Sequence, residues 1–206
     1  MNANNQIAAP MKHYTALYKK LDPQAAAARC GIEFKSDEFI FNLLGRTVKV
    51  AFPDFYAYDA VNPDKKLSDG VMILLIRYII EGAGGRGSGK FISYAEVPWG
   101  QVYLGNFKGR CIARLAFGFG SDLLRFSRAC EALGGIPVPA PNRTGDASYD
   151  IEFLSEFIIR VIIWGPDEEM PPNAQILFSD NFPLAFKAED IAVVGDVLID
   201  AMKKVN

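Results

Sequence analysis

Two short runs rich in β-branched and aromatic residues, Glu38–Leu43 and Thr47–Phe52, are separated only by Leu44-Gly45-Arg46. A connection this short joins antiparallel strands, because parallel strands need a crossover of about a dozen residues or more. We therefore expect a hairpin here. Two later runs, Phe157–Trp164 and Ala174–Phe178, also have strand character, so the chain should contain an antiparallel sheet.

Helical segments precede and follow these strands. Tyr14, Leu17, Tyr18 and Leu21 share one helical face. A second helix is expected from Asp22-Pro23 to Cys30, with Asp22 as the N-terminal cap and Gly31 as the left-handed closing residue. Further along the chain, we expect a buried helix at Val71–Ile80 after Ser68 and a short helical turn opened by the capping box Ser93-Tyr94-Ala95-Glu96. Two apolar stripes then predict a helical hairpin: Phe107, Cys111, Ile112 and Leu115 in its first helix, and Leu123, Phe126, Cys130 and Leu133 in its second, which Ser121 caps. The last expected element is an amphipathic helix at Glu189–Lys204.

These elements predict the α+β class, with an antiparallel sheet packed against several helices in one domain over residues 1–206. Residues 134–150, rich in glycine and proline, are expected to form a connecting loop. The segment Glu33–Ile40 resembles Glu152–Ile158 across a one-residue gap, and each leads through strands to an apolar helix. This match suggests two repeated strand-strand-helix halves, residues 32–82 and 150–204.

The charge balance argues against nucleic acid as a partner. Lysine and arginine total 22 and aspartate and glutamate total 24, giving a net charge of -2, so no general attraction to phosphate backbones exists.

The first residues lack a basic segment followed by an apolar one, and the apolar Val71–Ile80 is too short to span a bilayer. Cys30, Cys111 and Cys130 are widely spaced, as expected of reduced thiols. We expect a cytoplasmic protein that binds neither membranes nor nucleic acid.

The most conspicuous motif is the glycine-rich stretch from Gly82 to Lys90. It fits two phosphate-binding patterns incompletely: G-x-G-x-x-G at Gly82–Gly87 and G-x-x-x-x-G-K at Gly84–Lys90. In the second pattern, Phe91 stands where a hydroxyl should reach Mg²⁺. Both patterns also need a preceding strand and a following helix, whereas a helix is expected before this stretch. The backbone donors of this stretch, with two cations, could still bind an anion; the alternative is a solvated surface connection. The candidate residues are Gly84, Gly85, Arg86, Gly87 and Lys90.

An aromatic and acidic cluster follows this stretch. A planar ligand could stack on Trp99 or Tyr103 beside Glu96; the alternative is that Trp99 anchors the core and Glu96 only closes the capping box. His13 is the only histidine. It is therefore the one candidate imidazole ligand for a macrocycle, against a structural role at a helix edge. Asp167-Glu168-Glu169 offers carboxylates to a cation or forms a solvated turn.

Several stretches are similar to those of an uncharacterised family of anaerobic bacteria and archaea, catalogued only as a domain of unknown function. These stretches are Glu81-Gly82, Gly89–Tyr94, Pro98–Tyr103, Gly165–Glu169, Pro171–Phe178 and Ala188–Gly195. The resemblance covers about Tyr14 to Ile199. Because some relatives are linked to iron-sulfur modules or to corrinoid-dependent one-carbon metabolism, it implies a corrinoid or tetrapyrrole connection and a protein partner in that metabolism. It transfers no catalytic residue.

Three hypotheses follow from the sequence. The first is a binding or accessory protein for a planar macrocyclic cofactor, a corrinoid or haem, with the glycine-rich stretch near its acidic groups. The second is an enzyme acting on a small anionic substrate held by Arg86 or Lys90, with Glu96 or Asp167 as proton carrier. The third is a protein-interaction module with an exposed apolar patch.

Overall fold

The computed structural model describes residues 4–205, and its strands form one antiparallel sheet. The order along the sheet is β4-β3-β2-β7-β8-β9-β5, with β1 paired to β2 and β6 paired to β7. The predicted α+β class is therefore confirmed. The strands are β1 (Glu33–Lys35), β2 (Glu38–Leu43), β3 (Arg46–Ala51), β4 (Tyr56–Asp59), β5 (Phe91–Ser93), β6 (Ile136–Pro137), β7 (Ala147–Leu154), β8 (Phe157–Trp164) and β9 (Asn173–Ser179).

The predicted helices are present, but α7 (Phe182–Ala185) was not predicted, and the helical stretch around Phe107–Leu115 begins earlier than predicted, at Gly100. The helices are α1 (Asn4–Tyr18), α2 (Pro23–Cys30), α3 (Asp69–Glu81), the 3₁₀ turn η1 (Tyr94–Glu96), α4 (Gly100–Phe107), the π-helical η2 (Lys108–Ala113), α5 (Arg114–Phe119), α6 (Leu123–Ala132), α7 and α8 (Ala188–Lys203). The Asp22 carboxylate accepts from the first turn of α2, Gly31 is left-handed, and Ser68 caps α3. These local signals were sufficient because each cap satisfies otherwise unpaired backbone groups.

The sheet order is symmetric about the contact between β2 and β7. The meander β2-β3-β4 leads to α3, and the meander β7-β8-β9 leads to α7 and α8. The two meanders meet where Leu43 pairs with Leu154. The chain thus has two halves built around three-stranded meanders rather than strand pairs, and the first half has the additional strand β1. The matched segments are both tight hairpins, β1-β2 and β7-β8, and do not occupy equivalent strands of the two meanders.

Two local expectations are wrong. The cap of α6 is Asp122 rather than Ser121, because the Asp122 carboxylate accepts from the Arg125 amide at 2.9 Å. The segment 134–150 is only partly a loop, since β6 pairs with Tyr149 and Asp150 inside β7. This pairing is a long-range contact that the local glycine and proline content conceals.

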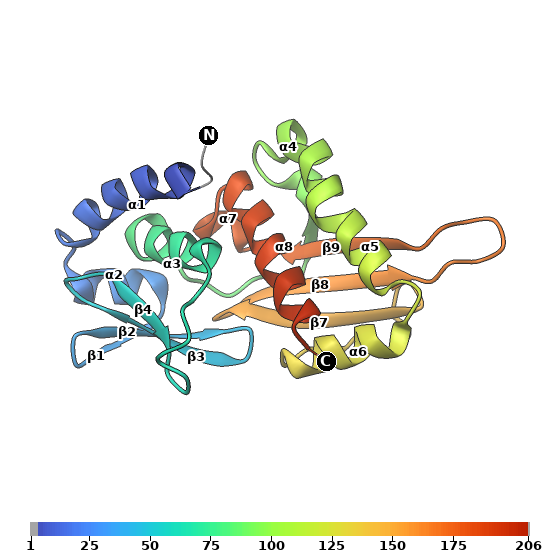
Figure 1. Cartoon of the computed structure of the whole chain (residues 1–206), viewed down its shortest axis with the longest axis horizontal. Coiled ribbons are helices and arrows are strands. Elements are labelled where there is room, and N and C mark those ends of the chain that lie inside the picture. The colour runs from blue at the N-terminus through green and yellow to red at the C-terminus, as the bar shows by residue number, and fades with distance from the viewer. Residues whose placement is uncertain (1–3, 206) are drawn as a thin grey trace.

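The helices cover one face of the β7-β8-β9 half, where α5 and α8 lie across the strands (Figure 1). That face carries the buried residues Ile151, Val161 and Phe178. Successive strand residues point to opposite faces, so Glu152, Ile158 and Arg160 lie on the other face.

Within residues 4–205, no helix has the length and apolar character needed to cross a membrane. Cys30, Cys111 and Cys130 are free thiols buried in the core.

The two halves are also joined through α3 and α8. Arg77 of α3 and Asp190 of α8 form an ion pair at 2.6 Å, largely withdrawn from solvent. The Lys187 ammonium pairs with Glu81 at 3.0 Å, at the surface. Desolvation raises the pKa of the Asp190 carboxyl, although the Arg77 charge opposes the rise. This buried pair fixes how the two helices face each other.

Candidate functional site

The glycine segment, residues 82–90, connects α3 to β5 and is packed against the end of α2. The amide of Gly84 donates to the Arg29 carbonyl at 2.9 Å, and the amide of Ala83 donates to the Leu184 carbonyl at 3.1 Å. A Cβ atom on Gly84 would lie 2.1 Å from the Cys30 carbonyl oxygen. Glycine is therefore required at position 84 by close approach of two backbones.

The middle of the glycine segment is tied to the turn between β9 and α7. The Asn181 side-chain amide donates to the carbonyl oxygens of Gly85 at 2.7 Å and Glu156 at 3.1 Å. The Ser88 amide donates to the Asp180 carboxylate at 2.9 Å, and the Ser88 hydroxyl donates to the other oxygen of that carboxylate. These bonds lower the pKa of Asp180. The segment is thus anchored to the sheet rather than being only a solvated connection.

A cleft of about 400 Å³ lies between the glycine segment and the face of β7-β8-β9 that points away from α5 and α8. We call it the glycine cleft. Its lining residues come from the glycine segment, β5, the β7-β8 hairpin and the end of β9; they are Arg86, Gly87, Gly89, Lys90, Phe91, Glu152, Glu156, Ile158 and Ser179. Three of the predicted candidates, Arg86, Gly87 and Lys90, are therefore brought together in one cleft.

The donors of the glycine cleft are uncommitted. Within residues 4–205, Arg86 and Lys90 form no ion pair, and the amides of the lining residues Arg86, Gly87, Gly89 and Lys90 donate to no protein acceptor. Arg160 lies on the same face of the sheet, but its guanidinium is already bound by other side chains. Its guanidinium pairs with Asp150 at 2.7 Å and lies 4.1 Å from the centre of the Phe91 ring.

Glu152 and Glu156 are the acidic residues that line the glycine cleft, and the Glu152 carboxylate already accepts hydrogen bonds. Glu152 accepts from the Asn42 side-chain amide and from the Glu156 backbone amide, both at 3.0 Å. Glu156 has a φ of 68°, in the left-handed region, which costs an ordinary residue about 1–2 kcal/mol. The Glu152 and Asn181 hydrogen bonds hold the Glu156 backbone in this conformation. The positive φ belongs to the two-residue turn Ser155-Glu156 between β7 and β8, because tight hairpin turns require this conformation.

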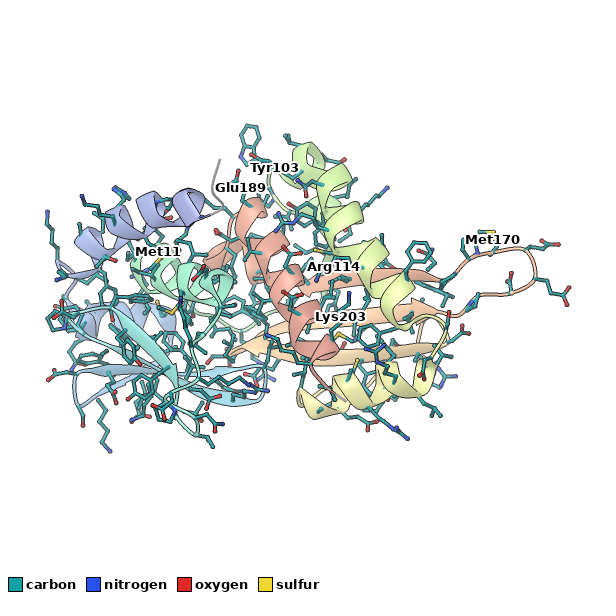
Figure 2. The ribbon with its side chains drawn as sticks, in the orientation of Figure 1. Met11, Tyr103, Arg114, Met170, Glu189 and Lys203 are labelled. Atoms are coloured by element: carbon teal, nitrogen blue, oxygen red, sulfur yellow. The ribbon has the colours of Figure 1, made fainter. Side chains whose placement is uncertain are left out.

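Six predicted candidates do not line the glycine cleft: Gly84 and Gly85, which lie next to it in the glycine segment, and four residues farther away. Glu96 accepts from the Ser93 amide at 2.8 Å and from its hydroxyl at 2.7 Å, and these bonds lower its pKa. Trp99 is 79% exposed, so it is not a core anchor. Tyr103 of α4 lies beside Glu189 of α8 (Figure 2), and a hydrogen bond to that carboxylate raises its pKa. His13 is exposed on α1, with its ring beside Tyr14.

A second cleft, also of about 400 Å³, lies beside the capping box. Its lining includes Ser93, Tyr94, Phe107 and Trp164. The rings of Tyr94 and Phe107 are stacked with centres 4.0 Å apart. Trp164, which was not among the predicted candidates, lines this cleft. Trp164 pairs with Asn173 of β9, which also lines the cleft, and no local sequence pattern indicates this pairing.

Metal-binding groups are not concentrated anywhere in residues 4–205, where no group of three or more His, Cys, Asp or Glu side chains could hold an ion. The acidic stretch 167–169 lies in the projecting loop between β8 and β9, which also carries Met170 (Figure 2). The Asp167 carboxylate accepts from the amides of Glu169 and Met170. This stretch forms an exposed turn, as the alternative interpretation predicted.

The comparison with known families covers most of the chain. The family model described as "Domain of unknown function (DUF3786)" matches residues 22–201. The chain belongs to the DUF3786 family. Neither the curated proteins nor the solved structures contain a match to it. The expected resemblance to an uncharacterised family is therefore confirmed, and the DUF3786 match includes the glycine segment together with its anchor at Asp180 and Asn181.

Proposed function

We propose that the protein binds a small anionic ligand in the glycine cleft. The observation that carries this proposal is the convergence of Arg86 and Lys90, neither of them ion-paired within the described chain, on one cleft of about 400 Å³. Successive backbone amides without protein acceptors add further donors, and such an arrangement is suited to carboxylate or phosphate oxygens. The anchor at Asp180 and Asn181 supports this role, because it organises the segment before a ligand arrives.

Binding is better supported than catalysis. The residues lining the glycine cleft include neither a cysteine nor a histidine. The Ser179 hydroxyl donates to Asn181 and accepts from the Ile158 amide at 3.0 Å, so it is used within the fold. Glu96 and Asp167, the expected proton carriers, are exposed, and Glu96 has a lowered pKa. A general acid at neutral pH needs a raised pKa instead.

A planar macrocycle with acidic side groups is one form of this proposal. Arg86 and Lys90 fit the propionates of haem or the phosphate of a corrinoid, and Phe91 and Ile158 offer apolar contact to a ring. The glycine cleft supplies no histidine, cysteine or methionine to a central metal, and His13 lies on α1, outside its lining. The residues therefore fit the periphery of the macrocycle but not its metal, and the simple anion is the better-supported ligand class.

Titration of the full chain tests both forms. The probes are inorganic phosphate, citrate, cobalamin and haem, followed by calorimetry and by absorbance spectra. We expect the variant Arg86→Ala/Lys90→Ala to weaken anion binding at least about tenfold, equivalent to about 1.4 kcal/mol. The matched control Lys35→Ala/Arg128→Ala removes two exposed cations elsewhere and should leave the affinity unchanged.

The outcomes separate the two forms. Anion binding that the cleft variant weakens, without a shifted macrocycle band, supports the anion site and excludes the macrocycle. A stoichiometric complex with a shifted band that the cleft variant loses supports the macrocycle. Equal affinity in the wild type and the cleft variant, or no binding of any probe at millimolar concentration, contradicts the proposal.

A second candidate function is protein interaction through α4. Trp99 and Val102 are 79% and 70% exposed, and both lie at the start of this helix. Large apolar side chains that gather at a surface are typical of interaction sites. If this patch pairs with a second copy, sedimentation should give a mass that rises with concentration and that Trp99→Ser/Val102→Ser restores to the monomer. A monomer at all concentrations would exclude self-association.

A further inference from the structure

A third cleft, of about 210 Å³, lies where the two halves of the sheet meet. We call it the junction cleft. One side is formed by the β2-β3 turn and the segment that leads into α3, and the other by the last turns of α8. Its position is separate from the glycine cleft, with which it shares no lining residue.

The floor of the junction cleft is apolar. Leu43 of β2, Val48 of β3 and Leu133, which follows α6, are buried side chains that line it. Val71 and Val197 add further aliphatic surface from α3 and α8. An aliphatic group placed on this floor would leave water, which stabilises binding by about 0.8 kcal/mol for each buried methylene.

The rim of the junction cleft is cationic. Arg46, Lys65, Lys66 and Lys204 line it and are exposed. Within residues 4–205, Lys65 and Lys204 form no ion pair, and Arg46 and Lys66 approach carboxylates only at 4.0 Å and 3.9 Å. An anion at this rim would therefore not compete with a strong existing pair.

The two carboxylates of the junction cleft are already satisfied. Asp59 is 4% exposed and accepts from the amides of Val61 at 2.9 Å and Asn62 at 3.1 Å. Asp200 pairs with Arg114 at 2.5 Å. The four cations therefore outnumber the acids that could oppose a ligand, and the cleft combines an apolar floor with an anion-attracting rim.

We propose that the junction cleft binds a short aliphatic carboxylic acid. The carboxylate lies among the rim lysines, and the hydrocarbon chain lies on Leu43, Val71 and Val197. The volume suits a short chain rather than a nucleotide or a macrocycle. The apolar floor disfavours a second charge at the far end of the ligand, because a charge without a partner there would lose its hydration.

Calorimetric titration of the full chain with octanoate tests this proposal. We expect saturable binding that Lys65→Glu/Lys204→Glu weakens at least about tenfold and that added salt also weakens. Both lysines are exposed, so the variant should keep the fold, which its circular dichroism spectrum checks. Octanol, which has the chain without the charge, should bind at least about tenfold more weakly than octanoate.

A variant that fills the cleft tests the floor independently of the rim. Ala201 is half-buried in the lining, and Ala201→Phe should abolish octanoate binding while the thermal transition stays cooperative. Absence of octanoate binding to the wild type, equal binding of octanol, or unchanged binding in either variant overturns the proposal. The glycine-cleft variant Arg86→Ala/Lys90→Ala should bind octanoate normally, so failure at one cleft does not decide the other.

Discussion

The side-chain amide of Asn181 donates to the carbonyl oxygen of Gly85 across 2.7 Å, although the two residues are 96 positions apart in sequence. The same amide group donates to Glu156, and its oxygen accepts from the Ser179 hydroxyl. Asn181 is only 3% exposed. A single buried side chain thus links the glycine segment, the β7-β8 hairpin and the end of β9, which are three of the four parts that form the glycine cleft.

Replacing Asn181 with alanine should therefore loosen the glycine cleft and the fold together. The buried Ser179 hydroxyl would lose its acceptor, and leaving such a group unpaired costs about 1–3 kcal/mol, while Gly85 and Glu156 would each lose a part-buried hydrogen bond. Urea denaturation measures the loss, and limited proteolysis within residues 82–90 measures the local effect. The control Asn106→Ala, exposed on α4, should change stability by less than about 0.5 kcal/mol. Similar results for the two variants would contradict this role of Asn181.

Glycine-to-alanine changes should have opposite effects at two positions. Gly84→Ala places a Cβ atom 2.1 Å from the Cys30 carbonyl oxygen, and relieving this overlap should cost about 1–3 kcal/mol or more. Gly105 lies inside α4, where an added Cβ meets nothing within 4 Å. Gly105→Ala should therefore stabilise by about 0.5–1 kcal/mol. Thermal unfolding of both variants checks the signs, and a tolerated Gly84→Ala would exclude the close approach.

Much of the fold could be predicted from the sequence because its elements are locally encoded. The caps at Asp22, Gly31 and Ser68, and the short turn at Leu44-Gly45, each satisfy backbone groups or φ angles within a few residues. The antiparallel sheet followed from the short hairpin and from the two later runs with strand character. The strand order and the pairing of β6 with β7 were not predictable in this way, because they depend on contacts between distant segments.

The glycine cleft was only half predictable. The cations Arg86 and Lys90 were selected correctly as neighbours because they lie in one unusual stretch. Glu152 and Glu156 were missed as lining residues, since nothing local shows that the β7-β8 hairpin approaches residues 82–90. Trp99, Glu96 and Tyr103 were grouped with the cleft by sequence proximity, although β5 carries the chain away from it.

The buried pair of Arg77 and Asp190 predicts an unusual order of variant stabilities. Arg77→Met leaves the Asp190 charge buried without its partner, which should cost about 3–5 kcal/mol. Adding Asp190→Asn removes that charge while the Asn oxygen still accepts from the Lys187 amide, a bond of 3.1 Å in the wild type. The double variant should therefore be more stable than Arg77→Met alone, as urea denaturation would show. The exposed pair of Lys19 and Asp54 is the control, where Asp54→Ala should cost less than about 1 kcal/mol.

The anchor of the glycine segment should also be sensitive to acid. The hydrogen bonds from Ser88 hold the pKa of Asp180 below its ordinary value in the folded protein. A depressed folded pKa gives stability that is fully present above the unfolded pKa of about 3.9 and is lost as pH falls through the folded pKa. The wild type should therefore be more stable than Asp180→Asn at about pH 6, and the difference should shrink toward about pH 2. Thermal midpoints of both proteins across this range measure it, and a difference that does not change with pH would exclude ionised Asp180 as the anchor.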